Sequence, residues 1–483
     1  MAKKKAVKKG AAKAPKKPVK AGAKAAAPKG KKAPAKKVPA KKAAGKGKSA
    51  AQKLRLASPL PHAPKAAALA GKAPKGAPSA RAFVVPVSRG LLSKEPRTLS
   101  ENYDEFQHDH EVTAIIQANP HSILRVDMAH CNPGSGLEDG DGPETIDFAK
   151  KQLAEMRGLF TELRDFFYVY KITVKGRPGA EQIGLGAHVA TAAIHDPQTN
   201  PGGKIIRNEA IFVHKAEGRA RLIQGLGAVI GTVNLCAPDP DRALQKALQK
   251  LSSGRPCDIG GVDRKGDRHE VWVVREKTDL DALTALYAGR ELFVADGNHR
   301  SKASQLIGLS HFLAVIFCGE TMNIDPYHRL VADIPFPPAV FVAELQKRGF
   351  KVTPLAQKTP FAATEPHRVG LYIGGSWYLL EPQNLSGLDA RSRIDAQLIE
   401  DRILRDLLGR DPGDKRIAYV GGDYNPAYLQ KKVDDGTYQA AFSMPAMTMK
   451  EFYAINEARQ LLPRKTTWFT PKIRSGLVIG LLD

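Results

Sequence analysis

Apolar residues change their spacing along the globular part of the chain, and each spacing predicts a type of element. Between residues 143 and 160 they recur every three or four positions, from Ile146 to Met156, which predicts an amphipathic helix. Runs rich in β-branched and aromatic residues at 165–174 and 181–194 predict two strands. The Gly and Pro residues between these runs mark a loop across which the strands can pair.

Further elements follow from the same periods. Strands that alternate with helices are typical of an α/β fold, here a mixed α+β body. We expect a first α/β domain at 95–335 and a C-terminal α/β part at 336–483 that packs into the same body. The expected strands are 122–128, 268–276, 290–297, 311–319 and 416–422, with a hairpin at 369–381; the expected helices are 218–230, 279–289, 300–308, 393–409 and 448–462.

The first 94 residues differ in composition from the rest. They hold 27 Lys and Arg and no Asp or Glu, whereas the whole chain holds 74 basic and 49 acidic residues. The remainder is therefore nearly neutral, with 47 basic and 49 acidic residues. With few large apolar side chains, residues 1–94 cannot offset the entropy of ordering, which predicts a long disordered basic tail.

The Lys/Ala/Pro-rich tail resembles those of linker histones and histone-like bacterial proteins. A flexible polycation releases counterions from a polyanion, which predicts non-specific binding to nucleic acid. The alternative is a solubilising tail without a dedicated partner.

Targeting and redox features point to the cytoplasm. No apolar segment follows the basic start and no stretch reaches about 18 apolar residues, so we expect neither a secretory signal nor a membrane span. The four cysteines are scattered, which predicts reduced, mostly buried thiols and a cytoplasmic protein, associated with the nucleoid if its tail binds DNA. His188, His195 and His214 share no convincing metal-ligand spacing, and we assign no metal ligands.

The most informative stretch is "LFVADGNHRSKASQL", residues 292–306. An apolar strand ends in Asp296-Gly297 and is followed at once by a helix, whose unpaired N–H groups favour an anion. Gly297 permits a tight turn and close approach of a ligand. Arg300 and Ser301 are candidate phosphate ligands, and His299 is a candidate for proton transfer. The alternative is a capped turn with a structural His and a surface Arg.

This stretch resembles the Ala-Asp-Gly-His-His-Arg hallmark of a prokaryotic family of unknown function, the one numbered ten-fifteen. Four other segments resemble the same family in the same order: "YVYKITV" with "QIGLGAHVATAAI", "IIRNEAIFVHKAEGRARLI", "NIDPYHRLV" and "PRKTTWFTPKIRSGLVI". The chain departs from the family pattern at Asn298 and Asn208, where the family has His, at Ser301-Lys302 after the Arg, and at Gly218, where it has Asp.

The hallmark loop is also similar, more distantly, to the phosphate-binding turn of the ParB and sulfiredoxin-like fold. That group includes kinases of free serine and CTP-binding partition proteins. The resemblance implies that Gly297, Asn298, His299 and Arg300 hold nucleotide phosphates. A likeness of fold supports binding better than it supports a particular reaction.

Other segments carry further candidates. Glu209 could be a general base or a Mg²⁺ ligand, although a solvated helix start would show the same letters. The other candidates for phosphate binding are Lys215, Arg219, His328, Arg329, Lys465 and Thr466. For His328-Arg329, and for the Lys-Thr-Thr turn that begins at Lys465, the alternative is that the side chains only pack locally.

Two functions of different class follow. The first is a nucleotide-dependent phosphotransferase, using ATP or ADP with Mg²⁺, that acts on a small hydroxyl substrate such as a free serine-like amino acid. Asp296, His299 and Glu209 would be its catalytic residues. The second is a nucleotide- or metabolite-sensing, DNA-associated protein without kinase turnover. A third possibility is an anionic metabolite other than a nucleotide. The oligomeric state is left open.

Overall fold

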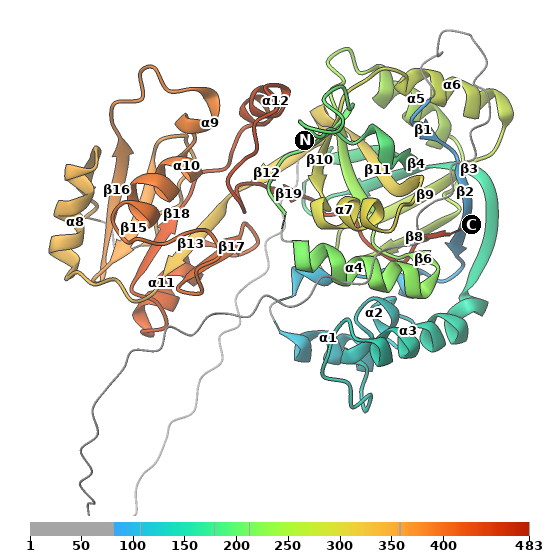
Figure 1. The fold of residues 1–483 in the computed structure, drawn as a ribbon, viewed down its shortest axis with the longest axis horizontal. Helices are drawn as coiled ribbons and strands as arrows, with labels where there is room; N and C mark the ends of the chain where they lie inside the picture. Colours follow the sequence, from blue (N-terminus) through green and yellow to red (C-terminus); the bar gives the residue numbers. More distant parts are fainter. Residues whose placement is uncertain (1–81, 107, 178, 212, 357–358, 483) are drawn as a thin grey trace, which may run out of the picture. The chain divides into compact units, whose positions relative to one another are not determined.

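The computed structural model describes residues 82–482, with gaps at 107, 178, 212 and 357–358. It confirms a mixed α/β body (Figure 1). Most of the expected basic tail, residues 1–81, lies outside the described residues. Residues 84–93, however, are strands β1 and β2, so the boundary expected after residue 94 is wrong. The apolar run from Phe83 to Leu92 pairs with the sheet rather than belonging to the tail.

Two large sheets organise the described residues. The first has twelve strands, whose central path runs β5-β10-β7-β11-β4-β3-β2-β20-β6. Its strands are β1 (Val84–Val85), β2 (Val87–Ser93), β3 (Phe160–Thr173), β4 (Glu181–Ala190), β5 (Ile205–Arg207), β6 (Ala228–Val229), β7 (Val233–Ala237), β8 (Ile259–Val262), β9 (Arg268–Val274), β10 (Leu292–Asp296), β11 (His311–Cys318) and β20 (Val478–Leu481).

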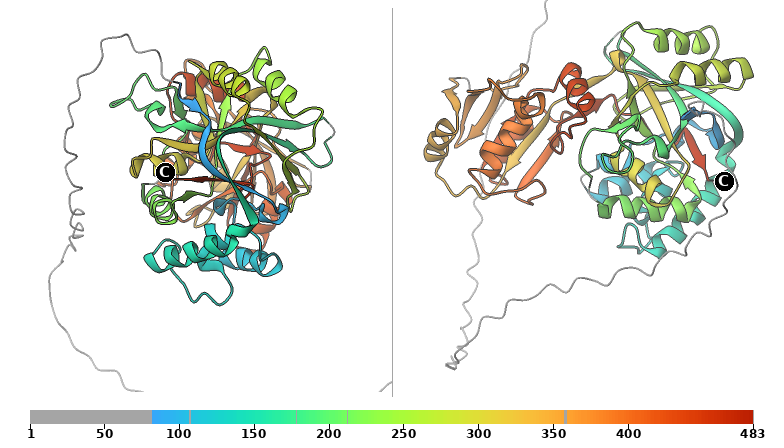
Figure 2. Two further views of the ribbon diagram at one scale, coloured as in Figure 1. Left: turned by 90° about the vertical axis from the view of Figure 1, so that its right-hand side faces the viewer. Right: turned by 45° about the horizontal axis from the view of Figure 1, so that its top comes forward.

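The second sheet has six strands in the order β14-β16-β15-β18-β13-β17. They are β13 (Tyr327–Val331), β14 (Phe350–Pro354), β15 (Val369–Ile373), β16 (Ser376–Pro382), β17 (Ile417–Gly421) and β18 (Ala440–Ser443). The short strands β12 (Asn323–Asp325) and β19 (Trp468–Thr470) form a separate pair. After β18 the chain returns to the first sheet, where β20 pairs with β2 (dark red and blue in Figure 2).

Alternating side chains give each sheet two buried faces. On one face of the first sheet, Phe167 and Val169 belong to a buried cluster that includes residues of α5 and α6. On the other face, Phe166 and Tyr168 belong to a cluster that includes residues of α4, α7 and α12 (Figure 1). The larger helices are α1 (Asp109–Ala118), α3 (Pro143–Met156), α4 (Val213–Leu226), α5 (Ala243–Ser252), α6 (Lys277–Tyr287), α7 (Asn298–Leu306), α8 (Pro338–Lys347), α11 (Pro426–Asp434) and α12 (Met449–Glu457).

Most expected elements are confirmed, and the errors have physical reasons. The runs at 165–174 and 181–194 form antiparallel β3 and β4. The strand expected at 122–128 is wrong, because Leu124–Asp127 is a short helix, α2. Ser122 Oγ accepts the Leu124 N–H at its start, and the apolar residues face two different helix-packed clusters.

The helix expected at 393–409 is divided. It consists of α9 (Ala390–Arg393), α10 (Asp395–Ile399) and a π-helical turn at Glu400–Arg405. The helix expected at 218–230 begins earlier and ends at Leu226. No helix among the described residues is both long and apolar enough to cross a bilayer. The four cysteines are free, and all but the half-buried Cys257 are buried.

Candidate active site

The turn between β10 and α7 forms as its sequence predicts. β10 lies between β5 and β7, and it ends at Asp296. Gly297 then adopts φ 96°, a left-handed conformation that favours glycine, and α7 begins at Asn298. A Cβ at Gly297 would also lie 3.3 Å from the Val233 backbone. The first N–H groups of α7 therefore start at the edge of the sheet.

A small polar cavity opens beside this turn. Its volume is about 40 Å³, which is room for a few water molecules and not for a whole nucleotide. Four carboxylates and two lysines contribute to its wall. It is lined by Asp104, Glu105, Asn208, Glu209, Ala295, Asp296, Asn298, Tyr327, Lys465, Thr467, Trp468, Phe469 and Lys472.

Asp296 is held as a carboxylate. Its Oδ2 lies 3.0 Å from Lys472 Nζ, and its Oδ1 accepts the Gly297 N–H at 2.8 Å. Arg300 Nη2 lies 3.4 Å from Oδ1. Burial favours the neutral acid, but Lys472 and Arg300 outweigh it and lower the pKa of Asp296 well below its usual range. Asp296 is therefore suited to hold a cation, not to take up a proton.

Glu209 lines the same cavity and lies just after β5. Burial raises its pKa above the usual value, and the charge of Lys465 opposes this only in part. One carboxylate oxygen accepts the backbone N–H of Lys465 at 3.1 Å. The cavity thus contains two carboxylates whose environments move their pKa values in opposite directions, a pattern typical of sites that assign acid and base roles.

Two asparagines join the turn to the C-terminal segment. Asn298 Nδ2 donates to Asn208 Oδ1 at 2.7 Å, and Asn208 Nδ2 donates to Thr467 Oγ1 at 3.4 Å. Both side chains are almost fully buried. Asn298 Oδ1 has no hydrogen-bond partner within the described part of the chain. The two positions at which the sequence has Asn instead of the family's His therefore meet in space.

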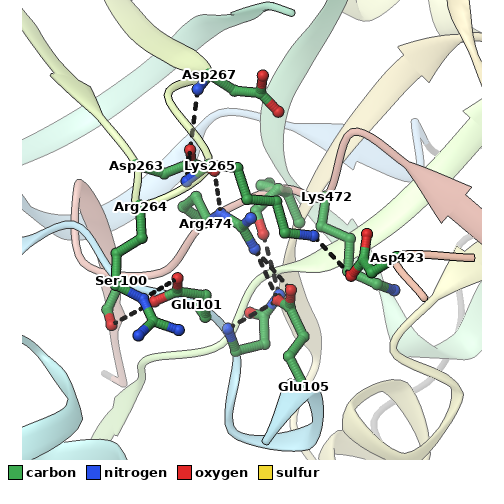
Figure 3. A network of polar contacts seen from close by, with 12 residues as sticks. Ser100, Glu101, Glu105, Asp263, Arg264, Lys265, Asp267, Asp423, Lys472 and Arg474 are labelled. Atoms are coloured by element: carbon green, nitrogen blue, oxygen red, sulfur yellow. Dashed lines mark hydrogen bonds and ion pairs between the residues drawn. The ribbon is translucent and has the colours of Figure 1, made fainter. Parts of the chain in front are cut away.

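A buried arginine, Arg474, holds one of the carboxylates that line the cavity, Glu105, in place. Arg474 Nη1 donates to both oxygens of Glu105, at 2.9 and 2.8 Å, while its Nε donates to Asp263 at 2.8 Å (Figure 3). Arg474 and Asp263 are almost completely buried. Glu105 is thus positioned at the cavity by the segment that also carries Lys472.

Two aromatic rings also line the cavity. Tyr327 and Trp468 meet edge to face, with ring centroids 5.2 Å apart. Lys472 Nζ lies 4.4 Å from the Trp468 ring centroid, and Lys465 Nζ lies 5.4 Å from that of Tyr327. The rings therefore orient both cations of the cavity.

Of the residues expected from the sequence, Asp296, Asn298, Glu209 and Lys465 line the cavity. Gly297, His299, Arg300 and Ser301 belong to the same turn but do not line it. Arg300 is buried and donates to the Thr232 carbonyl. Ser301 Oγ donates to the Asn298 carbonyl at 3.0 Å and accepts from Arg207 Nε at 3.3 Å.

The remaining candidates lie outside the cavity wall. Arg219 forms an ion pair with Asp127 at 2.5 Å, and Lys215 is an exposed residue of the same helix, α4. Thr466 donates to the Pro463 carbonyl at 2.7 Å. His328 and Arg329 are buried in β13, where they bond to the backbone.

Sequence reasoning left out several lining residues. Asp104 and Glu105 precede the first recognised element, and no local pattern marks them. Lys472, Thr467 and Trp468 were not missed in the same way, because they stand in "PRKTTWFTPK", the segment whose Lys-Thr-Thr turn was a candidate for binding a carboxylate or phosphate. Only the fold shows that these side chains share one cavity with Asp296 and Glu209.

Comparisons with known proteins gave three kinds of result. A comparison with curated proteins found no match. Among solved structures, a free serine kinase in complex with AMP is 13% identical, with a TM-score of 0.32, covering 57% of this chain and 89% of its own. A C-terminally truncated SbnI from Staphylococcus aureus is 13% identical, with a TM-score of 0.34, covering 60% and 84%.

A conserved hypothetical protein from Pyrococcus furiosus is 14% identical, with a TM-score of 0.31, covering 57% of this chain and 92% of its own. Overlap at this level does not establish a shared activity. The family model described as "Protein of unknown function (DUF1015)" matches residues 92–403, well over half of the chain. The chain therefore belongs to the DUF1015 family.

Proposed function

We propose that this protein is a phosphotransferase that uses a nucleotide to phosphorylate the hydroxyl group of a small substrate such as a free serine-like amino acid. The observation that carries the proposal is that Glu209 and Asp296 line one cavity with their pKa values moved in opposite directions. Lys465 and Lys472 stand beside them. Carboxylates and lysines in one small wall complement a zwitterion, whose ammonium and carboxylate need opposite charges.

Glu209 is the general base in this proposal. The substrate hydroxyl gives its proton to Glu209 as its oxygen forms a bond to the terminal phosphorus of the nucleotide. The bond from that phosphorus to the bridging oxygen breaks, and the nucleotide leaves with the electron pair. A carboxylate with a raised pKa is the better proton acceptor of the two. Asp296, kept ionised by Lys472, attracts the substrate ammonium or a metal ion.

The nucleotide would meet the cavity with its phosphates alone. The cavity is too small for the base and ribose, and the first N–H groups of α7, at Asn298 and His299, are suited to phosphate oxygens. Mg²⁺ commonly uses one or two protein carboxylates and takes further ligands from substrate phosphates. Asp296, which is kept ionised, would supply such a carboxylate, while Glu209 remains free to accept the proton; when bound, the ion would neutralise charge on the transferred phosphoryl group.

The test is turnover and binding with the full chain. Calorimetric titration with ATP, ADP and CTP in the presence of Mg²⁺ comes first, followed by phosphorus NMR of mixtures with serine, threonine and homoserine. We expect Glu209→Gln to bind nucleotide normally and to lower turnover by about 10²–10⁴-fold, the usual contribution of a general base. Glu217→Gln, an exposed neighbour in α4, is the matched control.

Two outcomes would remove the proposal. One is the absence of saturable binding of any of the three nucleotides to the wild-type protein. The other is turnover by Glu209→Gln at the wild-type rate.

We also propose that the basic N-terminal segment binds nucleic acid without sequence preference. The support is its composition, 27 basic and no acidic residues in the first 94. Because β2 begins at Val87, the correct truncation removes residues 1–81 and not 1–94. Loss of DNA binding with unchanged small-molecule binding supports separate roles. DNA binding that survives the truncation supports the alternative of a ligand-sensing, DNA-associated protein.

A further inference from the structure

A cluster of three different side chains lies where α1 begins. Cys131 Sγ is 3.3 Å from His130 Nε2, and the same nitrogen is 3.5 Å from Asp109 Oδ2. The three ligand atoms all lie within 4.8 Å of one another. Asp109 is the first residue of α1, and the other two close the short 3₁₀ turn η3 (Ala129–Cys131). The cluster therefore joins two segments that are separated by the whole of α1.

This arrangement is not a catalytic relay. In a Cys-His-Asp relay the thiol and the carboxylate bond to different ring nitrogens. Here both converge on Nε2 of His130, while Nδ1 is buried and has no hydrogen-bond partner in the described part of the chain. A ring nitrogen carries either one proton or one lone pair, so it can form only one well-aligned hydrogen bond. It therefore cannot bond to both the thiol and the carboxylate. Three potential ligand atoms gathered within 4.8 Å of one another are an arrangement that a cation can organise.

The distances match a tetrahedral metal. With bond lengths of about 2.3 Å to sulfur and about 2.0 Å to nitrogen or oxygen, a tetrahedral Zn²⁺ site separates S from N by about 3.5 Å and N from O by about 3.3 Å. The observed separations are 3.3 and 3.5 Å. Thiolate, imidazole and carboxylate are also the ligand types that Zn²⁺ takes.

We propose that Asp109, His130 and Cys131 bind a Zn²⁺ ion, with water in the fourth position. Asp109 is 70% exposed, so the open side faces solvent and the ion can enter. The local core is small: Cys131 packs with only Val112, Ile116 and Leu124 as its buried partners in the cluster. Small cores are commonly stabilised by a metal.

The site has a consequence for the neighbouring cavity. Glu105, which lines the cavity, stands four residues before Asp109 in the chain. An ion that ties Asp109 to the 130–131 turn therefore restrains the segment that carries Asp104 and Glu105. Zn²⁺ binding displaces the thiol proton, because a cysteine binds the metal as a thiolate. Affinity should consequently rise with pH.

The test uses the full chain, purified under reducing conditions and freed of metal with a chelator. Zn²⁺ is titrated calorimetrically, and Co²⁺ serves as the spectroscopic probe. We expect about one ion per chain, release of one proton, and Co²⁺ absorption with a thiolate charge-transfer band and the strong visible bands of tetrahedral coordination. The melting temperature of the metal-free protein should increase when Zn²⁺ is added.

Variants assign the ligands. Asp109→Asn alters an exposed side chain, so it should fold normally and weaken Zn²⁺ binding by at least about tenfold, the lower end of the effect of losing even an outer-shell partner. Cys131→Ser should abolish the charge-transfer band. Cys257→Ser and Asp147→Asn are the matched controls and should bind as wild type does. If Cys131→Ser does not fold, the Zn²⁺ affinity of Asp109→Asn and the Co²⁺ spectrum of the wild type decide whether the metal site exists.

Three results would overturn the proposal: no stoichiometric Zn²⁺ binding, a Co²⁺ spectrum without a thiolate band, or affinity that Asp109→Asn leaves unchanged. None of them bears on the phosphotransferase proposal, which depends on different residues.

Discussion

Three His-Arg pairs occur in this chain, and the fold uses two of them, His299-Arg300 and His328-Arg329, in different ways. His299-Arg300 follows a strand end and begins α7, beside the cavity. His328-Arg329 lies in the middle of β13, between β17 and β18. There His328 Nδ1 accepts the Met444 N–H at 3.0 Å, and Arg329 Nη1 donates to the Tyr327 carbonyl at 2.6 Å.

The position of a His-Arg pair within an element decides whether its side chains and backbone can contact a ligand. Inside a paired strand, neighbouring side chains point to opposite faces and are buried by both layers. His328 and Arg329 accordingly satisfy the backbone around them, and only the preceding Tyr327 reaches the cavity. At a strand end that becomes a helix, N–H groups are left without partners, and a ligand can use them.

The largest expected effect is on stability, from removing each arginine. Arg300→Met removes a partner of the buried Asp296 carboxylate and should lower the free energy of unfolding by about 3 kcal/mol, near the lower end for breaking a buried pair because Lys472 remains. Arg329→Met leaves buried carbonyls unbonded and should cost about 1–3 kcal/mol. Denaturant unfolding measures both.

Ligand binding separates the two variants. Under conditions in which both are folded, Arg300→Met should weaken ADP binding at least tenfold, because Asp296 and Gly297 lose their support. Arg329→Met should bind as the wild type does. Equal weakening by both substitutions would contradict the division between the pairs.

The next largest effect is a pH dependence that belongs to the strand pair. Burial, and to a lesser extent Arg329, lowers the pKa of His328 to about 4. In the unfolded chain the imidazole takes up a proton near its usual pKa of about 6.5. Between these values the unfolded state binds more protons, so the contribution of His328 to stability is complete above about pH 6.5 and is lost as the pH falls toward 4.

The full difference corresponds to at most about 3 kcal/mol. His328→Gln removes the titrating group and keeps an oxygen that can accept the Met444 N–H. The difference in stability between wild type and this variant should therefore narrow by that amount between pH 7 and pH 4 in denaturant titrations. A difference that stays constant with pH would show that His328 does not become protonated on unfolding.

Much of the fold could be predicted because hydrophobic periods report local structure. The hairpin of β15 and β16 and the turn from β10 to α7 both carried strong signals, in the Gly374-Gly375 turn and in Asp296-Gly297. The strand predicted at 122–128 is wrong, because a short buried helix and a buried strand can have the same run of apolar residues. The pattern at 393–409 could not reveal the breaks between its helices.

The site could be predicted only where its residues are neighbours in sequence. Asp296 and Asn298 were found because one turn carries them, and Glu209 because its segment resembles the family pattern. Asp104 and Glu105 reach the cavity from a segment far from these in the chain, so their roles depend on long-range pairing, whereas Lys472 lies in the C-terminal segment that also supplied Lys465. The asparagines at 208 and 298 looked like two independent departures, yet they form one hydrogen bond.

The smallest expected effect concerns His299 and sharpens the comparison with His328. Burial, and next the positive charge of Lys215, lower the pKa of His299 to about 4. Lys215 is exposed on α4, so Lys215→Gln should not unfold the protein. It should raise the pKa of His299 part of the way toward 6.5, since burial still opposes the charged form. The pKa of His328, far along the chain, should not change.

Proton–nitrogen NMR titration measures the pKa of both imidazoles, and Lys246→Gln, which alters an exposed lysine of α5, is the control. A shift of His328 equal to that of His299 would mean that net charge, rather than the neighbouring lysine, tunes the histidine beside the cavity.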